Sequence, residues 1–143
     1  MRSDFWDDLL CVRKRYAAAL EPVCREYAMT QNAMDVLLFL FNNPEYDRAA
    51  DIEERRNIAK SHVSAAVQEL AERGLLQRGY EPGDRRTVHL KITADGREIA
   101  WKGKAVQNTF FQKAFAGISE EECEQMKGRV TRISKNISNL EEK

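Results

Sequence analysis

The sequence is poor in the residues from which metal centres and disulfide frameworks are built. Its 143 residues include three cysteines and two histidines. Cys11, Cys24 and Cys123 are odd in number and lack the spacing of metal ligands, which indicates reduced thiols and not a disulfide framework. We therefore expect neither a metal site nor a bound cofactor.

Long apolar segments are also missing. No apolar run approaches the roughly 18–20 residues that a membrane-spanning helix requires. The N-terminal residues Met1–Asp4 bring an acidic side chain where a secretory signal peptide needs an apolar core, so we expect no export signal. With 43% hydrophobic and 32% charged residues, the composition fits one soluble cytoplasmic domain, or a small domain with helical extensions.

Recognisable catalytic arrangements are absent as well. Neither His62 nor His89 is paired with a serine, a cysteine or a carboxylate in a known catalytic pattern. The sequence has no glycine-rich phosphate loop and no cluster of metal ligands. We therefore do not expect an enzyme, and His89 is most simply a surface residue of a strand.

The net charge of zero conceals an uneven distribution. Residues 55–91 carry eight basic and four acidic side chains, whereas the rest of the chain carries 15 basic and 19 acidic ones. Residues 30–54 alone contain one arginine and six acids. A local positive surplus is what attraction to nucleic-acid phosphates requires, although many solvated surfaces reach a surplus of this size.

Residues 58–92 contain the most informative pattern in the chain. Val63, Val67 and Leu70 recur at spacings of four and three, which predicts one apolar stripe on a helix. Gly74 ends this helix, where a left-handed residue is favoured. The short or polar residues off the stripe are Lys60, Ser61, His62, Ser64, Ala65 and Gln68.

A basic β-hairpin is predicted directly after this helix. A strand over Leu75–Glu81 leads into a turn at Pro82–Asp84, which is followed by Arg85 and Arg86. The second strand alternates Val88, Leu90 and Ile92 with Thr87, His89 and Lys91. A helix with a polar outer face beside a basic hairpin is the shape of a winged helix-turn-helix that binds duplex DNA.

Three helices are predicted ahead of this stretch. The first covers residues 4–28, and Pro22 either kinks it or starts a second segment. The next helices cover Gln31–Asn42 and Ala49–Arg56. Asn57 is a left-handed turn residue, so the short helix, this turn and the central helix form the helix-turn-helix.

Two further helices are predicted after the hairpin. The first extends from Asp95 to about Ala116 behind a Thr93 cap, and Gly117 breaks it. Ser119–Glu122 is a capping box that opens the last helix. That helix carries an apolar seam at Cys123, Met126, Val130, Ile133, Ile137 and Leu140. Such a seam favours a partner helix from a second copy, although it could also pack inside one chain.

Four segments carry a specific combination of motifs: Lys60–Ser64, Gly74–Arg78, Asp84–Arg86 and Val88–Gly96. In these motifs, and over nearly its whole length, the chain resembles MarR-family transcriptional regulators. The resemblance implies a homodimer with a triangular outline, whose two winged helices grip a pseudo-palindromic operator in double-stranded DNA. It also implies repression that a small ligand or oxidation relieves.

The predicted fold is therefore mainly α with a small β wing. Residues 1–29 would form an N-terminal dimerisation helix, residues 30–93 the winged helix-turn-helix DNA-binding domain, and residues 94–143 the C-terminal dimerisation helices. The family's ligand cleft lies between the dimer region and the winged helix, where a small aromatic effector would bind. Possible lining groups here are Trp6, Tyr16 and Trp101.

Three positions depart from the family pattern. Ala59 stands where a serine or threonine usually caps the recognition helix, and such a replacement typically costs about 1 kcal/mol. Glu53 and Arg56 stand where small or apolar residues normally face the core. Arg56 can lay its aliphatic stem on the core or contact a phosphate.

The groove chemistry of duplex DNA assigns roles to the candidate residues. The major groove presents a distinct pattern of donors and acceptors for each base pair. The candidates for base edges are Ser61, His62, Ser64 and Gln68, with Lys60 on a phosphate. By the family match, Arg86 enters the flanking minor groove, where narrow A/T-rich DNA attracts arginine. Asp84 would hold the Arg86 guanidinium by a charge-assisted pair, and Arg85 would meet a phosphate.

Two alternatives remain open from the sequence. Cys11 lies close to the reactive cysteine of the family's peroxide-sensing branch, with Lys14 and Arg15 on its helical face and Asp7 and Asp8 opposing them. A winged helix can also serve as a docking surface for proteins. Such a module needs no basic wing and would show no salt-dependent affinity for DNA.

Overall fold

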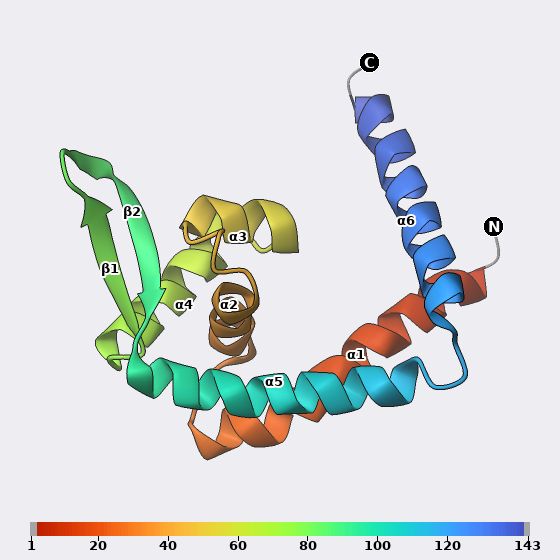
Figure 1. Ribbon diagram of the computed structural model, residues 1–143, viewed down its shortest axis with the longest axis horizontal. Coiled ribbons are helices and arrows are strands. Elements are labelled where there is room, and N and C mark those ends of the chain that lie inside the picture. Colours follow the sequence, from red (N-terminus) through yellow and green to blue (C-terminus); the bar gives the residue numbers. More distant parts are fainter. Residues whose placement is uncertain (1–2, 142–143) are drawn as a thin grey trace. The chain divides into compact units, whose positions relative to one another are not determined.

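The computed structural model describes residues 3–141, which form six helices and a two-stranded sheet (Figure 1). The elements are α1 (Ser3–Glu26), α2 (Gln31–Asn42), α3 (Ala49–Arg56), α4 (Lys60–Glu72), β1 (Leu76–Glu81), β2 (Asp84–Ile92), α5 (Ala94–Ala114) and α6 (Glu120–Glu141). The chain divides into two units, one ending at Phe110 and the other beginning at Phe111. The fold is mainly α with a small β wing, as the sequence predicts.

Helix α2 lies at the centre of the hydrophobic core of the first unit. Seven of its 12 residues are buried, and it packs against α1, α4 and β2. Thr30 caps it, because its Oγ1 accepts a hydrogen bond from the backbone N–H of Ala33 at 3.1 Å. With apolar side chains around most of its circumference, α2 is the element against which its neighbours bury their own stripes.

The short helix and the turn of the helix-turn-helix have the predicted positions. Helix α3 ends at Arg56, Asn57 adopts a left-handed conformation with φ of 51°, and α4 begins at Lys60. The α4 stripe of Val63, Val67 and Leu70 is buried against α2 and α3. The stripe fixes the rotation of α4, so its polar side faces away from the core.

The wing is an antiparallel hairpin in which Leu76 pairs with Ile92 and Arg78 with Leu90. Gly74 precedes it with φ of 71°, the left-handed conformation predicted for this position. The first strand begins at Leu76, one residue later than predicted, because the N–H of Leu75 still bonds the Leu70 carbonyl of α4 at 2.9 Å.

The start of α5 is fixed closely against the base of the wing. The Oγ1 atom of Thr93 accepts from the N–H of Gly96 at 3.1 Å and donates to the Gly74 carbonyl at 2.7 Å. A Cβ atom on Gly96 would lie 2.2 Å from the carbonyl oxygen of Leu75. Only glycine fits at this approach of helix and strand, which explains the spacing of threonine and glycine in the sequence.

The terminal helices differ from the prediction in detail. Helix α1 is a single helix that continues through Pro22, so the predicted second segment is wrong. Helix α5 ends at Ala114, slightly before the predicted end, and Gly117 follows with φ of 82°. The capping box at Ser119 and Glu122 is confirmed, with hydrogen bonds of 2.7 and 3.1 Å. Within residues 3–141, none of the helices has the length and apolar character needed to cross a membrane.

Candidate nucleic-acid interface

The outward face of α4 presents every side chain that the sequence assigned to it. The residues Lys60, Ser61, His62, Ser64, Ala65 and Gln68 are all exposed, whereas the intervening stripe is buried. Ala59, at the N-cap, gives no side-chain hydrogen bond to the first turn. The N-terminal end of α4 is therefore left to water or to an anion, and a helix N-terminus favours negative charge.

Gln68 is held at both ends of its side-chain amide. Its Oε1 accepts from Nη2 of Arg78 at 3.1 Å, and its Nε2 donates to Oε1 of Glu72 at 2.6 Å. Arg78 lies on β1, so this contact joins the first strand of the wing to the outward face of α4. The sequence analysis did not assign Arg78 to the site, since only the path of the hairpin brings it beside α4.

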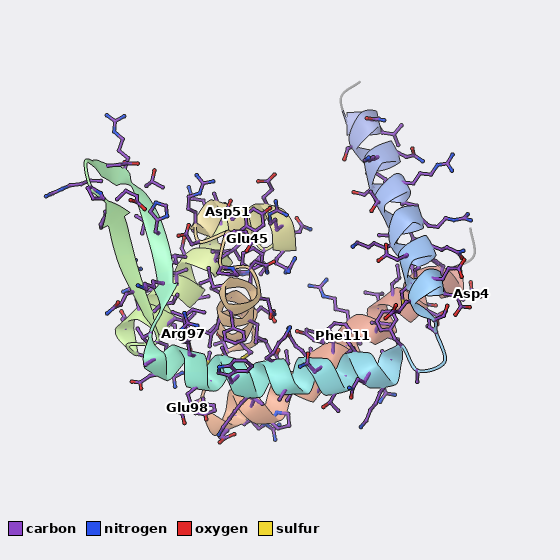
Figure 2. The ribbon with its side chains drawn as sticks, viewed as in Figure 1. Asp4, Glu45, Asp51, Arg97, Glu98 and Phe111 are labelled. Carbon is purple, nitrogen blue, oxygen red and sulfur yellow. The ribbon has the colours of Figure 1, made fainter. Side chains whose placement is uncertain are left out.

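The tip of the wing carries two exposed arginines, Arg85 and Arg86, and long side chains project from this tip in Figure 2. Asp84 shapes the turn beneath them, because its Oδ1 accepts from the backbone N–H of Arg86 at 2.9 Å and of Thr87 at 3.3 Å. The hydrogen bond from the Arg86 amide and those from Thr87 lower the pKa of the Asp84 carboxyl. The structure thus shows Asp84 bonded to the Arg86 backbone, where the sequence analysis expected its guanidinium.

A contact between the side chains of Asp47 and His89 holds the second strand of the wing. The Nδ1 atom of His89 lies 2.9 and 3.0 Å from the two carboxylate oxygens of Asp47, and the N–H of Leu90 donates to the Asp47 carbonyl at 2.7 Å. The loop before α3 is thereby attached to β2. His89 lies on strand β2, as expected, and this contact partly buries it.

The far end of α4 is attached to the turn between α1 and α2. The Arg73 guanidinium donates to the backbone carbonyls of Tyr27 and Ala28. Thr30 Oγ1 donates to Glu69 Oε2 at 3.0 Å. The first contact joins α4 to the turn after α1, and the second joins it to the start of α2.

Two arginines of α3 contact aromatic rings at the edge of the core. The Arg56 guanidinium carbon lies 4.9 Å from the centre of the Phe39 ring, while the side chain stays exposed. This position fits the expected packing of its stem against the core. Glu53 is half-buried, and Arg55 stacks over the Tyr46 ring at 3.6 Å.

A cleft of about 540 Å³ opens in the first unit between α1, α2, α5 and the turn before α4. Tyr16 lines this cleft, as expected, but Trp6 and Trp101 do not. The Tyr16 hydroxyl accepts from Nε2 of Gln107 at 2.6 Å. Burial raises the pKa of the Asp35 carboxyl on the cleft wall, an effect that nearby Arg13 and Arg56 partly offset. The cleft thus combines apolar surface with two cations and one acid; its lining residues include Arg13, Tyr16, Asp35, Leu38, Phe39 and Arg56.

The three cysteines lie in different environments. Cys11 is exposed on α1, in a shallow depression that Lys14, Arg15 and Asp7 also line. Cys24 is buried, and this burial raises the pKa of its thiol. Cys123 is partly buried on α6. Among residues 3–141, no group of three or more histidine, cysteine or acidic side chains is placed to hold a metal ion.

Comparison with known proteins identifies this arrangement. The sequence model of the MarR family matches residues 29–87, which span α2 to the wing tip. In this segment the chain is similar to the MarR family of transcriptional regulators. It is also 26% identical, over 113 residues, to YdgJ of Bacillus subtilis, an uncharacterised helix-turn-helix-type transcriptional regulator. That match covers 79% of this chain and 68% of the relative.

Solved structures of MarR regulators share the fold. A MarR-family regulator from Listeria monocytogenes, in complex with a 26mer DNA, has a TM-score of 0.82 at 15% identity and covers 97% of this chain and 91% of that one. CouR from Rhodococcus jostii, bound to p-coumaroyl-CoA, has a TM-score of 0.77 at 24% identity, with 92% of each chain covered. At these identities the solved structures show a shared fold.

Proposed function

We propose that this chain is a MarR-type dimeric repressor that binds a pseudo-palindromic operator and leaves it when a small effector binds. The observation that carries the proposal is the position of the exposed polar face of α4 beside an arginine-tipped wing in the same unit. A helix and a hairpin placed in this way fit the major groove and the adjacent minor groove of one duplex.

The α4 face supplies the groups for the major groove. We assign contacts with base edges to Ser61, His62, Ser64 and Gln68, all of which are exposed. Lys60, at the start of α4, is assigned to a backbone phosphate, where the uncapped end of the helix adds favourable partial charge. Phosphate contacts set the register, and base contacts give the sequence preference.

The wing supplies the minor-groove contact. Arg86 is the residue assigned to the groove, since a narrow A/T-rich groove concentrates negative potential. Arg85 is assigned to a phosphate. Asp84 contributes by holding the backbone of the turn through the Arg86 and Thr87 amides, which presents the two arginines in a defined direction.

The terminal segments, 1–29 and 94–143, are proposed to form the dimer. In the first unit, the early turns of α1 expose Phe5, Trp6, Leu9, Leu10 and Val12. In the second unit, the exposed apolar residues are Phe111, Phe115, Ile118, Met126, Val130, Ile133, Ile137 and Leu140. Exposed apolar surfaces of this extent are unusual for a monomer and typical of an interface. A second copy would set the two α4 helices about one DNA turn, ~34 Å, or a multiple apart.

The cleft beside Tyr16 is proposed as the effector site. Its aromatic and apolar wall suits a small aromatic molecule, and Arg13 and Arg56 would attract an acidic group on it. The CouR structure holds p-coumaroyl-CoA, an aromatic acyl compound, which supports a ligand of this kind. An effector acts as an inducer when it binds the state with the wrong spacing of the two α4 helices more tightly.

Selection of bound sequences from a random duplex pool, followed by release with aromatic acids, tests the proposal. We expect a two-fold symmetric operator whose affinity falls steeply with salt. Arg86→Ala should weaken operator binding by about tenfold or more without changing the dimer, since it removes an inserted cation. Tight binding by this variant would contradict the wing assignment, and the lack of any selected sequence would favour a protein-docking module.

A further inference from the structure

Charged groups hold both ends of the Gln68 amide on the outward face of α4. Arg78 donates to its Oε1 and Glu72 accepts from its Nε2. A guanidinium can only donate hydrogen bonds, and an ionised carboxylate can only accept them. The amide therefore has one favourable orientation, because turning it over would set its NH2 group against Arg78 and its oxygen against Glu72.

Orientation matters for a glutamine that reads a base. Adenine is recognised when the amide oxygen accepts from N6 and the amide nitrogen donates to N7. An unrestrained glutamine can offer its two ends in either order. The amide oxygen has two lone pairs and the nitrogen has two hydrogens, so each end of Gln68 keeps one site beyond its contact with Arg78 or Glu72.

We propose that Arg78 and Glu72 are positioning residues that fix the direction of the Gln68 amide and so decide on which strand it reads adenine. The inference rests on the proposed function, specifically on α4 lying in the major groove. The oxygen of Gln68 faces β1 and its nitrogen faces the C-terminal end of α4. At a given base pair, adenine on one strand matches this order, whereas adenine on the other strand presents its donor and acceptor reversed.

A purely structural role for this trio is disfavoured by its exposure. Gln68, Glu72 and Arg78 are all exposed, and contacts between exposed charged or polar side chains contribute little to the stability of a fold. Such contacts can instead preorganise a side chain for binding, because a side chain already held in its binding orientation loses less conformational freedom on binding. The expected consequence is a change in base preference with little change in melting temperature.

Selection from a pool of duplexes with about 20 randomised base pairs, enough for two half-sites, tests this inference with the full chain. The wild type should select adenine on one strand at one position of each half-site. Arg78→Ala should accept adenine on either strand there, which lowers that discrimination by about tenfold. Gln68→Ala should lose the preference altogether. Gln77→Ala is the matched control, since the exposed Gln77 neighbours Arg78 on β1 but points to the opposite face of the hairpin.

A charge exchange gives the sharper comparison. The double variant Glu72→Arg with Arg78→Glu reverses both partners, so the amide should turn over and the strand preference should invert. A merely structural contact would not invert it. Melting temperatures close to the wild-type value for all variants show that the change in preference does not come from unfolding.

Three results would overturn the inference. An unchanged strand preference in Arg78→Ala, with a salt dependence reduced by about one counterion, would make Arg78 a phosphate contact. If both the strand preference and the salt dependence of Arg78→Ala are unchanged, Arg78 has no role in recognition. If Gln68→Ala selects the same sequences as the wild type, Gln68 does not contact a base. A wild-type chain that selects no sequence is a different result, because it refutes the proposed function first and this inference with it.

Discussion

Helices α2 and α6 both repeat apolar residues at helical spacing, yet they lie in opposite environments. The apolar residues of α2 are buried, and Val36 and Leu37 have no exposed surface. In α6, Val130 is 59% exposed and Leu140 is 72% exposed. A similar pattern therefore contributes to the hydrophobic core in α2, while in α6 it leaves an exposed apolar face. Hydrophobic periodicity thus defines a face of a helix but not what covers that face.

The largest effect is expected from a cavity in α2. Leu37→Ala removes a fully buried side chain and should lower the free energy of unfolding by about 2–5 kcal/mol, as measured by urea denaturation. Met126→Ala on α6 is the control, because Met126 is 42% exposed and its truncation should change this energy far less. Equal losses at the two sites would show that α6 folds as part of the same core.

Substitutions in the apolar seam of α6 should weaken dimer assembly more than they lower the stability of the fold. Ile133→Glu places a charge among its exposed apolar residues and should weaken the dimer at least about tenfold, as measured by analytical ultracentrifugation over a dilution series. Lys135→Glu makes a charge change off the seam and should leave the dimer intact. A dimer that resists Ile133→Glu would mean that other surfaces hold the two copies together.

Asp35 is a polar residue of α2 whose burial should make stability depend on pH. Burial raises the pKa of its carboxyl above the usual 3.8. The folded chain then binds this proton more tightly than the unfolded chain. The resulting stability is fully present below the unfolded pKa and is lost as the pH rises through the raised folded pKa. The melting temperature of Asp35→Asn, relative to wild type, should therefore rise across that window.

A matched variant keeps that experiment specific. Glu98→Gln, at an exposed position on α5 that Figure 2 labels, should show no comparable rise over the same pH range. A flat difference between Asp35→Asn and wild type would mean that Arg13 and Arg56 cancel the effect of burial.

Two cysteines of α1 also differ in exposure, and substituting the exposed one is expected to have the smallest effect. Cys11 is exposed and Cys24 is buried, so a thiol reagent should label Cys11 much faster. The Cys11→Ser protein should still bind its operator and leave it when the effector binds. Release of the wild type by peroxide, with the variant staying bound, would instead establish Cys11 as the sensor.

Much of the fold could be predicted from local physics. The bounds of α3, the left-handed Asn57 and the exposed face of α4 follow from helical spacing and turn chemistry in neighbouring residues. At Pro22 one of the two expected alternatives, a second segment starting there, was wrong, because α1 continues through it. A proline in a helix removes one backbone hydrogen bond, and packing of the surrounding turns can outweigh that loss.

The sequence alone determined where helices begin and end, which side of each is apolar and where the basic charge gathers, because these properties depend on residues a few positions apart. The residue pairs that shape the interface form only when the chain is packed. Arg78 meets Gln68 across 10 residues, His89 meets Asp47 across 42, and Arg73 meets Tyr27 across 46. Such pairs form because packing of the core brings distant segments of the chain together, and no local sequence pattern encodes that packing.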